Sequence, residues 1–301
     1  MQRIFLCKQA TSPIEAHIYE HLVMNTLKQT MQRANLLRQI DYYALGSHYS
    51  DTGFITIDID LYTNEAIDLA NKLRQLQADT SDGALCLATN QIVAEKNRTL
   101  TCDDIEALQQ NIATLNRTDW QAIDEINQPL IIKQLAEHKF LYEINKPAPS
   151  VNRISCSLNI SINDDPALLA LFYYLAFAIH GTVADIANTH LGYYSLEESA
   201  AKIDETLHCV CDFAVLSGLE NKVELQKIYH DTIKRIREEE ALDRICQRLK
   251  SFSYGSGRMD TPNIDMYISE LGAIIGEKTW KKLANASICL LYTSPSPRDR
   301  T

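Results

Sequence analysis

Two stretches of the chain, one in each half, alternate apolar with polar residues. In residues 51–62 (DTGFITIDIDLY), isoleucine and leucine alternate with threonine and aspartate, and residues 154–162 (ISCSLNISI) follow the same rule. Successive side chains of a strand point to opposite faces of a sheet, so this period of two predicts two half-buried strands. The short apolar runs at residues 3–7 and 207–216 predict two further strands.

Helix signals lie between these strands. Ser12, Pro13 and Glu15 supply an N-cap, a first-turn proline and a capping-box acid, and predict a helix that runs to about Leu37. Residues 80–83 (TSDG) provide a second start signal before a stripe at helical spacing, which comprises Leu85, Ala88, Ile92 and Glu95. Further helices are expected over residues 64–77, 105–115, 120–138, 166–187, 219–237 and 238–251.

The predicted elements repeat in order. Strand, helix, strand and helices occur on both sides of residues 145–150 (NKPAPS), a proline-rich segment typical of a linker. This order predicts an α+β protein with two related domains, each an antiparallel sheet packed with helices, and not a parallel α/β sheet. We expect the first domain to span residues 1–144 and the second to span residues 151–288.

The last residues of the chain differ in kind from the rest. Residues 289–301, which begin CLLYTSPSPRD, resemble the translation of an adapter used in sequencing libraries. We therefore expect this tail to be non-native and the native chain to be truncated near Ile288, so these residues are left out of the fold prediction.

Composition and charge narrow the class of protein. With 46% hydrophobic and 23% charged residues, the chain is predicted to be globular and not disordered. A net charge of −10 argues against a nucleic-acid groove, which needs clustered lysine and arginine. No run approaches the ~18 apolar residues of a membrane span, and no secretory signal opens the chain. We expect a cytoplasmic protein with no nucleic-acid or membrane partner, whose eight cysteines are reduced thiols.

The sharpest chemical signal is the sequence HIYEH, which places His17, Glu20 and His21 on the first predicted helix. The two histidines are one turn apart on one face, so both imidazoles can reach a single zinc ion. Glu20 lies on the adjoining edge, where it can act as a general base in the inverted zincin order. A catalytic zinc needs a third protein ligand, and Glu95 is the candidate because a carboxylate on an apolar stripe is costly to bury alone.

The sequence around these residues resembles the pitrilysin and insulin-degrading-enzyme family of zinc metallopeptidases, which includes the mitochondrial processing peptidases. The 73 residues between His21 and Glu95 are close to the spacing typical of that family. Three segments carry the resemblance: residues 16–22 (AHIYEHL), 44–54 (ALGSHYSDTGF) and 92–98 (IVAEKNR).

The resemblance implies a specific site and reaction. It makes His17, His21 and Glu95 the ligands of Zn²⁺ and Glu20 the general base of a zinc-dependent metalloendopeptidase. It also implies a LuxS/processing-peptidase-like fold that occurs twice, and as partners a peptide substrate together with a second peptidase-like half or a homodimer partner.

Several alternatives stay open at this point. If Glu95 is the upstream acid that family members often carry, the third ligand is Cys102, seven residues later. Two other functions would share the fold. One is a catalytically inactive subunit that acts as a scaffold or binds substrate, and the other is a zinc lyase or hydrolase of small metabolites.

Arg258 and Tyr267 have the residue types of the family's arginine and tyrosine pair, but their context does not match. Three further histidines are interpreted as loop or core residues: His48, His180 and His190.

Overall fold

A computed structural model describes residues 2–38, 40–50, 52–61, 75–96, 102–122, 150–161, 166–238, 240–241 and 243–244. Internal contacts divide the chain into two units. The first unit comprises Met1–Cys156, Gly181–Glu197 and Cys211–Ile228, and the second comprises Ser157–His180, Glu198–Val210 and Tyr229–Thr301. The expected domain limits at residues 1–144 and 151–288, and the nature of the tail, stay predictions.

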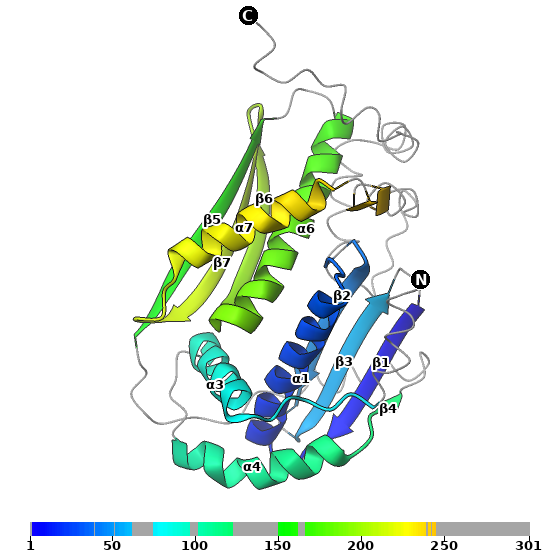
Figure 1. The fold of residues 1–301 in the computed structure, drawn as a ribbon, viewed down its shortest axis with the longest axis vertical. Helices are drawn as coiled ribbons and strands as arrows, with labels where there is room; N and C mark the ends of the chain where they lie inside the picture. Colours follow the sequence, from blue (N-terminus) through cyan, green and yellow to red (C-terminus); the bar gives the residue numbers. More distant parts are fainter. Residues whose placement is uncertain are drawn as a thin grey trace, which may run out of the picture. The chain divides into compact units, whose positions relative to one another are not determined.

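The first unit contains a four-stranded antiparallel sheet in the order β2-β3-β1-β4 (Figure 1). β1 and β3 pair along their full length, from Gln2 opposite Leu61 to Gln9 opposite Phe54, and both strands were expected from the sequence. The strands are β1 (Gln2–Gln9), β2 (Tyr42–Tyr49), β3 (Phe54–Leu61) and β4 (Gln121–Ala122).

Two parts of this sheet differ from the sequence prediction. β2 was not expected, because its sequence YYALGSHY does not alternate apolar with polar residues. In the structure, its pairing with β3 is irregular between Tyr42 and Leu45. The helix expected over residues 120–138 is wrong at its start, because Gln121 and Ala122 pair with Cys7 and Leu6 of β1. The remainder of that helix lies outside the described residues.

Helix α1 (Pro13–Arg33) begins as the capping signal predicts. The N–H of Glu15 donates to Ser12 Oγ at 3.3 Å, and the Glu15 carboxylate accepts the N–H of Thr11 at 3.2 Å. The first bond satisfies a donor that a helix start leaves unpaired, and the second ties the residue before the N-cap to the first turn. The helix ends at Arg33 and not near Leu37, because Asn35 adopts a left-handed φ of 58° that stops the helix.

Two further helices belong to the first unit: α3 (Asp82–Lys96) and α4 (Cys102–Arg117). Ser81 caps α3 by accepting the N–H of Ala84 at 3.4 Å, which confirms the second start signal. α1 and α3 lie side by side, and this places the two helices that carry the candidate ligands next to each other (Figure 1). Residues 64–74 of the helix expected over 64–77 lie outside the described residues.

A second sheet has the order β5-β7-β6. β5 and β7 run antiparallel, since the N–H of Ser217 just after β7 donates to the carbonyl of Ser150 just before β5 at 2.8 Å. The strands are β5 (Val151–Ser161), β6 (Tyr194–Ile203) and β7 (Thr206–Leu216), and the helices of this part are α6 (Pro166–Leu191) and α7 (Lys222–Ile236).

These elements test the sequence prediction for the second half. They confirm the expected strands at 154–162 and 207–216 and the helices at 166–187 and 219–237. β6 was not expected. Of the helix expected over 238–251, the described residues 240, 241, 243 and 244 are helical. The mixture of helices and antiparallel sheets confirms the α+β class, whereas the duplication of domains stays a prediction.

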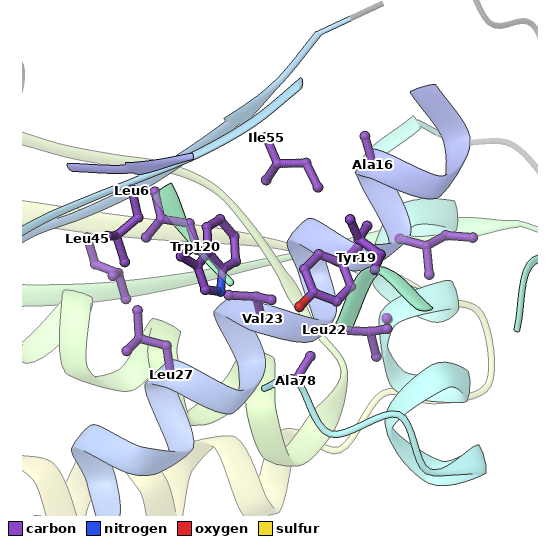
Figure 2. Close-up of a cluster of buried hydrophobic side chains, with 14 of the residues drawn as sticks. Leu6, Ala16, Tyr19, Leu22, Val23, Leu27, Leu45, Ile55, Ala78 and Trp120 are labelled. Atoms are coloured by element: carbon purple, nitrogen blue, oxygen red, sulfur yellow. The ribbon is translucent and has the colours of Figure 1, made fainter. Parts of the chain in front are cut away.

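The core of the first unit forms where α1 packs on its sheet. Figure 2 shows Tyr19, Leu22 and Val23 of α1 among apolar side chains that include Ile55 of β3 and Trp120. Leu22, Val23 and Ile55 are each at most 1% exposed. Burying side chains of this size contributes roughly 1.5–3 kcal/mol each to the free energy of folding. α1 is therefore held firmly against the sheet along its apolar face.

A buried lysine also fastens α1. Lys8 of β1 is 4% exposed and donates hydrogen bonds to the hydroxyl of Tyr19 and the carbonyl of Leu115, each at 3.0 Å. Its ammonium lies 4.7 Å from the ring centroid of Trp120, at a cation–π distance. Burial lowers the pKa of Lys8 to about 8, while the negative charge of Asp119 opposes this shift. Lys8 thus links β1, α1 and α4.

Across the described part of the chain, the structure contains no helix with the length and apolar character needed to cross a membrane.

Candidate metal centre

Helices α1 and α3 bring three side chains to one point. His17 and His21 come from successive turns of α1, and Glu95 comes from the last turn of α3. His17 is 1% exposed, whereas His21 and Glu95 are 13% and 16% exposed, so the group is open to solvent on one side. A histidine, histidine and carboxylate set with one open side has the composition of a catalytic zinc site.

The three ligand atoms are separated by the distances that a small ion requires. Glu95 Oε2 lies 3.0 Å from His17 Nε2 and 3.3 Å from His21 Nε2, and the two nitrogens are 3.2 Å apart. A tetrahedral ion with ligands at about 2.0–2.1 Å separates those ligands by roughly 3.3–3.4 Å. The side chains therefore fit Zn²⁺ with shifts of a few tenths of an ångström.

Gln91 fixes which nitrogen of His21 faces this point. The Gln91 amide group donates from Nε2 to the backbone carbonyl of Asn188 at 2.8 Å, and a carbonyl can only accept. Gln91 Oε1 therefore faces His21 Nδ1, 3.2 Å away, and Nδ1 must carry the proton. Asn25 holds the Gln91 amide in place with a reciprocal pair of bonds of 2.8 and 3.1 Å. The Nε2 lone pair of a neutral His21 is consequently directed at the ligand point.

The geometry at the ligand point favours a positive charge there. With its proton on Nδ1, neutral His21 presents the Nε2 lone pair to the carboxylate of Glu95 at 3.3 Å. Two acceptors at this distance repel unless a proton or a cation lies between them. Protons on His17 and His21 can supply that charge in place of a cation: burial would raise the pKa of Glu95, but hydrogen bonds and positive charge from the two imidazoles outweigh it and hold that pKa well below its usual range. A divalent cation satisfies all three groups at once.

Two residues of β2 support the residues on α1. The ring of Tyr49 stacks on the imidazole of His17 with a centroid distance of 4.2 Å and an interplanar angle of 14°. Ser47 Oγ donates to Glu20 Oε1 at 2.6 Å, and Glu20 is 9% exposed. Tyr49 thus limits rotation of the His17 ring, and Ser47 fixes the orientation of the Glu20 carboxylate.

Glu20, His21 and Glu95 open into a cavity of about 470 Å³. Tyr194, at the start of β6, lines the same cavity, and its ring centroid lies 6.2 Å from that of His21. Burial raises the pKa of Tyr194, and the negative charges of Glu95 and Glu20 raise it further. The phenol therefore stays protonated at neutral pH and can donate a hydrogen bond into the cavity.

The other residues singled out in the sequence lie elsewhere. Cys102 begins α4, but its side chain lies outside the described residues, as do Arg258 and Tyr267. His180 is a core residue, as expected, with its ring 2.7 Å from the Tyr229 hydroxyl and a pKa lowered to about 4 by burial. His48 and His190 were interpreted as loop or core histidines, and this is wrong for both. His48 lies in strand β2 and His190 in helix α6, and both side chains are exposed.

Sequence analysis missed the residues that support the site. Gln91 precedes Glu95 by four residues, so helical spacing alone places both on one face of α3 and could have identified it. Ser47 and Tyr49 lie in residues 44–54, a segment that carries the resemblance, but their role was not recognised because β2 was not predicted. Tyr194 had no comparable signal, because it lies on β6, which the sequence did not predict either.

Replacing Gln91 by leucine should weaken zinc binding by about 10- to 100-fold, since a supporting partner of a metal-binding histidine typically has that effect. The variant Gln91→Leu removes the acceptor that fixes the His21 tautomer and leaves all three candidate ligands in place. Competition with a chromogenic chelator would measure the affinity. The matched control is Asn90→Leu, a neighbouring amide of α3 that contacts Cys86 instead of the site. Equal zinc affinities for Gln91→Leu and the wild type would contradict the assigned role.

Comparison with known proteins gives distant structural similarity. No protein-family model matches the sequence, and no curated protein sequence matches it. The chain is similar to the ferredoxin protease FusC, solved as a mutant in complex with Arabidopsis ferredoxin, with 12% identity and a TM-score of 0.27. The similarity covers 94% of this chain but only 40% of the length of that protease.

Two further solved structures are similar over more of their length. A predicted insulinase family protease from Yersinia pestis has 10% identity and a TM-score of 0.28, over 95% of this chain and 81% of that one. The first half of the periplasmic protease PqqL from Escherichia coli has 11% identity and a TM-score of 0.25, and the similarity covers 96% of this chain and 82% of that one. Similarity of this degree carries no argument about the reaction, so the functional inference rests on the geometry of the site.

Proposed function

We propose that this protein is a zinc-dependent peptidase of the pitrilysin type, in which His17, His21 and Glu95 hold the metal. The observation that carries the proposal is the convergence of two imidazole nitrogens and one carboxylate oxygen at 3.0–3.3 Å from one another. The tautomer that Gln91 imposes on His21 supports it, because the free lone pair then faces the other two ligands.

The residues around the ligand point suit hydrolysis of an amide bond. Bound there, zinc would supply a Lewis acid that polarises the scissile carbonyl and acidifies the attacking water. Glu20 would accept the proton of that water and then deliver it to the leaving amine. The hydrogen bond from Ser47 to Glu20 keeps the carboxylate oriented during both transfers.

Two further features are consistent with a peptide substrate. Tyr194 lines the cavity as a protonated phenol, so it can donate to the oxygen that becomes negative during the attack. β2 is the outermost described strand of its sheet, and Leu45, Ser47 and Tyr49 of β2 line the same cavity. An extended peptide could therefore pair with β2 as an added strand beside Glu20.

The proposal is tested by hydrolysis of a mixture of fluorogenic peptides with the purified full chain. Activity should disappear after treatment with a chelator and return when about one equivalent of Zn²⁺ per chain is added. Mass spectrometry of the products would identify the bonds cleaved. Hydrolysis that survives complete removal of metal would contradict the proposal. Stoichiometric zinc without hydrolysis of any peptide would favour the second candidate, an inactive peptidase-like subunit that binds substrate.

A further inference from the structure

The last turn of α6 contacts both helices that carry the candidate ligands. Residues 181–197 belong to the same unit as α1 and α3, although they lie in the second half of the sequence. Asn188 in this turn is 4% exposed, and its backbone carbonyl and both ends of its side-chain amide have hydrogen-bond partners. A buried polar residue bonded in this way fixes the position of its neighbours.

The backbone carbonyl of Asn188 decides which way the Gln91 amide points. The last turn of a helix leaves carbonyl groups open to partners from other elements, and Gln91 Nε2 donates to this one at 2.8 Å. Asn25 also pairs with Gln91, but its own amide can turn over together with that of Gln91, so this pair fits either orientation. Of the contacts described for Gln91, the one with Asn188 is made by a group that can only accept.

The opposite orientation of Gln91 would spoil the site. Its N–H groups would then face His21 Nδ1, which would have to accept a hydrogen bond and so could not carry the proton. The proton of a neutral His21 would move to Nε2, the nitrogen that faces the ligand point. The orientation of Gln91 therefore determines whether His21 can bind a metal ion without first losing a proton.

The side chain of Asn188 holds this carbonyl in place. Its Oδ1 accepts a hydrogen bond from Lys28 Nζ at 2.6 Å, which ties the turn to α1. Its Nδ2 donates to the carbonyl of Tyr193, which fixes the path of the chain after the helix. The acceptor that Gln91 uses is thereby positioned relative to α1, the helix that carries His21.

Gly192 lets α3 approach the same turn. Its φ of 70° lies in the left-handed region that favours glycine, and a Cβ there would lie 3.2 Å from Leu87 Cδ1 of α3. Leu87, Gln91 and Glu95 follow one another at steps of four and share one face of α3. The face of α3 that meets the end of α6 is therefore the face that carries Gln91 and Glu95.

We propose that Asn188 is a positioning residue of the metal centre, which acts through Gln91 to select the tautomer of His21 that can bind the ion. The inference rests on the proposed zinc site and assigns part of its construction to the second half of the sequence. Removing a residue that supports a ligand lowers metal affinity, although the residue does not touch the ion.

The test is a double-mutant cycle on zinc affinity, measured in the full chain by competition with a chromogenic chelator. Asn188→Ala should weaken binding by about three- to tenfold, less than the roughly 10- to 100-fold typical of losing a direct partner of a ligand. In the Gln91→Leu background, the same substitution should change the affinity by less than about twofold, because the residue through which Asn188 acts is gone. Effects that multiply in the double variant would overturn the proposal.

The matched control is Thr189→Val, one position further along the same turn. Thr189 also ties α6 to α1, through hydrogen bonds of 3.2 and 3.3 Å with Gln32, and its other described bonds lie within α6. This variant should keep zinc affinity within about twofold of the wild type. A loss equal to that of Asn188→Ala would mean that loosening α6 is sufficient, and would overturn the specific role of Asn188.

A second pair of variants decides the question if thermal melting shows that Asn188→Ala does not fold. Gly192→Ala places a methyl group against Leu87 and should weaken zinc binding by displacing the turn from α3. Gly218→Ala, at a left-handed glycine with φ of 91° and open space around it, should leave the affinity unchanged. Equal zinc affinities for these two variants would overturn the proposal.

Because zinc binding is measured without hydrolysis, this inference and the peptidase proposal can fail separately. Coupling between Asn188 and Gln91 in a protein that cleaves no peptide would support the positioning role while contradicting the peptidase. Zinc-dependent hydrolysis without such coupling would overturn the positioning role alone, and a chain that binds no zinc would contradict both.

Discussion

Glu20→Gln should abolish most peptide hydrolysis while the protein keeps its zinc. Glutamine has nearly the same shape and can still accept the hydrogen bond from Ser47, but it cannot take a proton from water. Loss of a general base typically lowers the rate by about 10²- to 10⁴-fold. The measurement pairs kcat on a cleaved peptide with metal content by atomic absorption.

The control for this variant is Glu224→Gln, which makes the same chemical change at an exposed position of α7. It should leave both kcat and zinc content at the wild-type level. If Glu20→Gln hydrolyses peptides at the wild-type rate, Glu20 is not the base and the reaction needs a different proton acceptor.

The double variant His17→Ala/His21→Ala should bind no zinc, whereas the wild type should bind about one zinc per chain. Since the site joins α1 to α3, the metal binds the folded state, and a concentration of about 1,000 times Kd would stabilise the wild type by about 4.1 kcal/mol. Zinc should therefore raise the Tm of the wild type and leave the Tm of the double variant unchanged. Metal analysis and calorimetric melting test both statements.

Two single variants sharpen this result. His48→Ala removes an exposed imidazole that also lines the cavity and should leave zinc binding intact. Cys102→Ser tests the alternative third ligand and should likewise have no effect if Glu95 is the ligand. If the double variant retained zinc, or if Cys102→Ser lost it, the metal would have to be assigned to a different set of ligands.

The sequence predicted the elements whose burial pattern is local. β3 alternates buried Ile55, Ile57 and Ile59 with polar residues, and α1 begins at a capping box, so both could be recognised without tertiary information. β4 consists of two residues stabilised by pairing with β1, more than 110 positions earlier, and no local pattern encodes it. β6 contains the sequence LEESAAK, whose charges and lack of alternation hide a strand.

The same distinction applies to the candidate site. The relation of His17, Glu20 and His21 follows from helical geometry. The proximity of Glu95 depends on the packing of α3 against α1, and it was suggested by the position of Glu95 on an apolar stripe and by resemblance. The partners Ser47 and Tyr194 reach the site from strands that pair with distant parts of the chain. Sequence reasoning thus identified the reactive groups more readily than the residues that orient them.

Helix α1 contributes residues both to the candidate site and to the core, and this restricts how its length can vary. One surface of the helix carries the reactive residues, and another, with Leu22 and Leu27 each at most 1% exposed, fills the core. A single inserted residue would rotate everything after it by about 100°, which would turn polar groups into the core and apolar ones into the cavity. Insertions between Pro13 and Lys28 should therefore be eliminated by selection, while the turn after Arg33, where the helix has already ended, can accommodate changes in length.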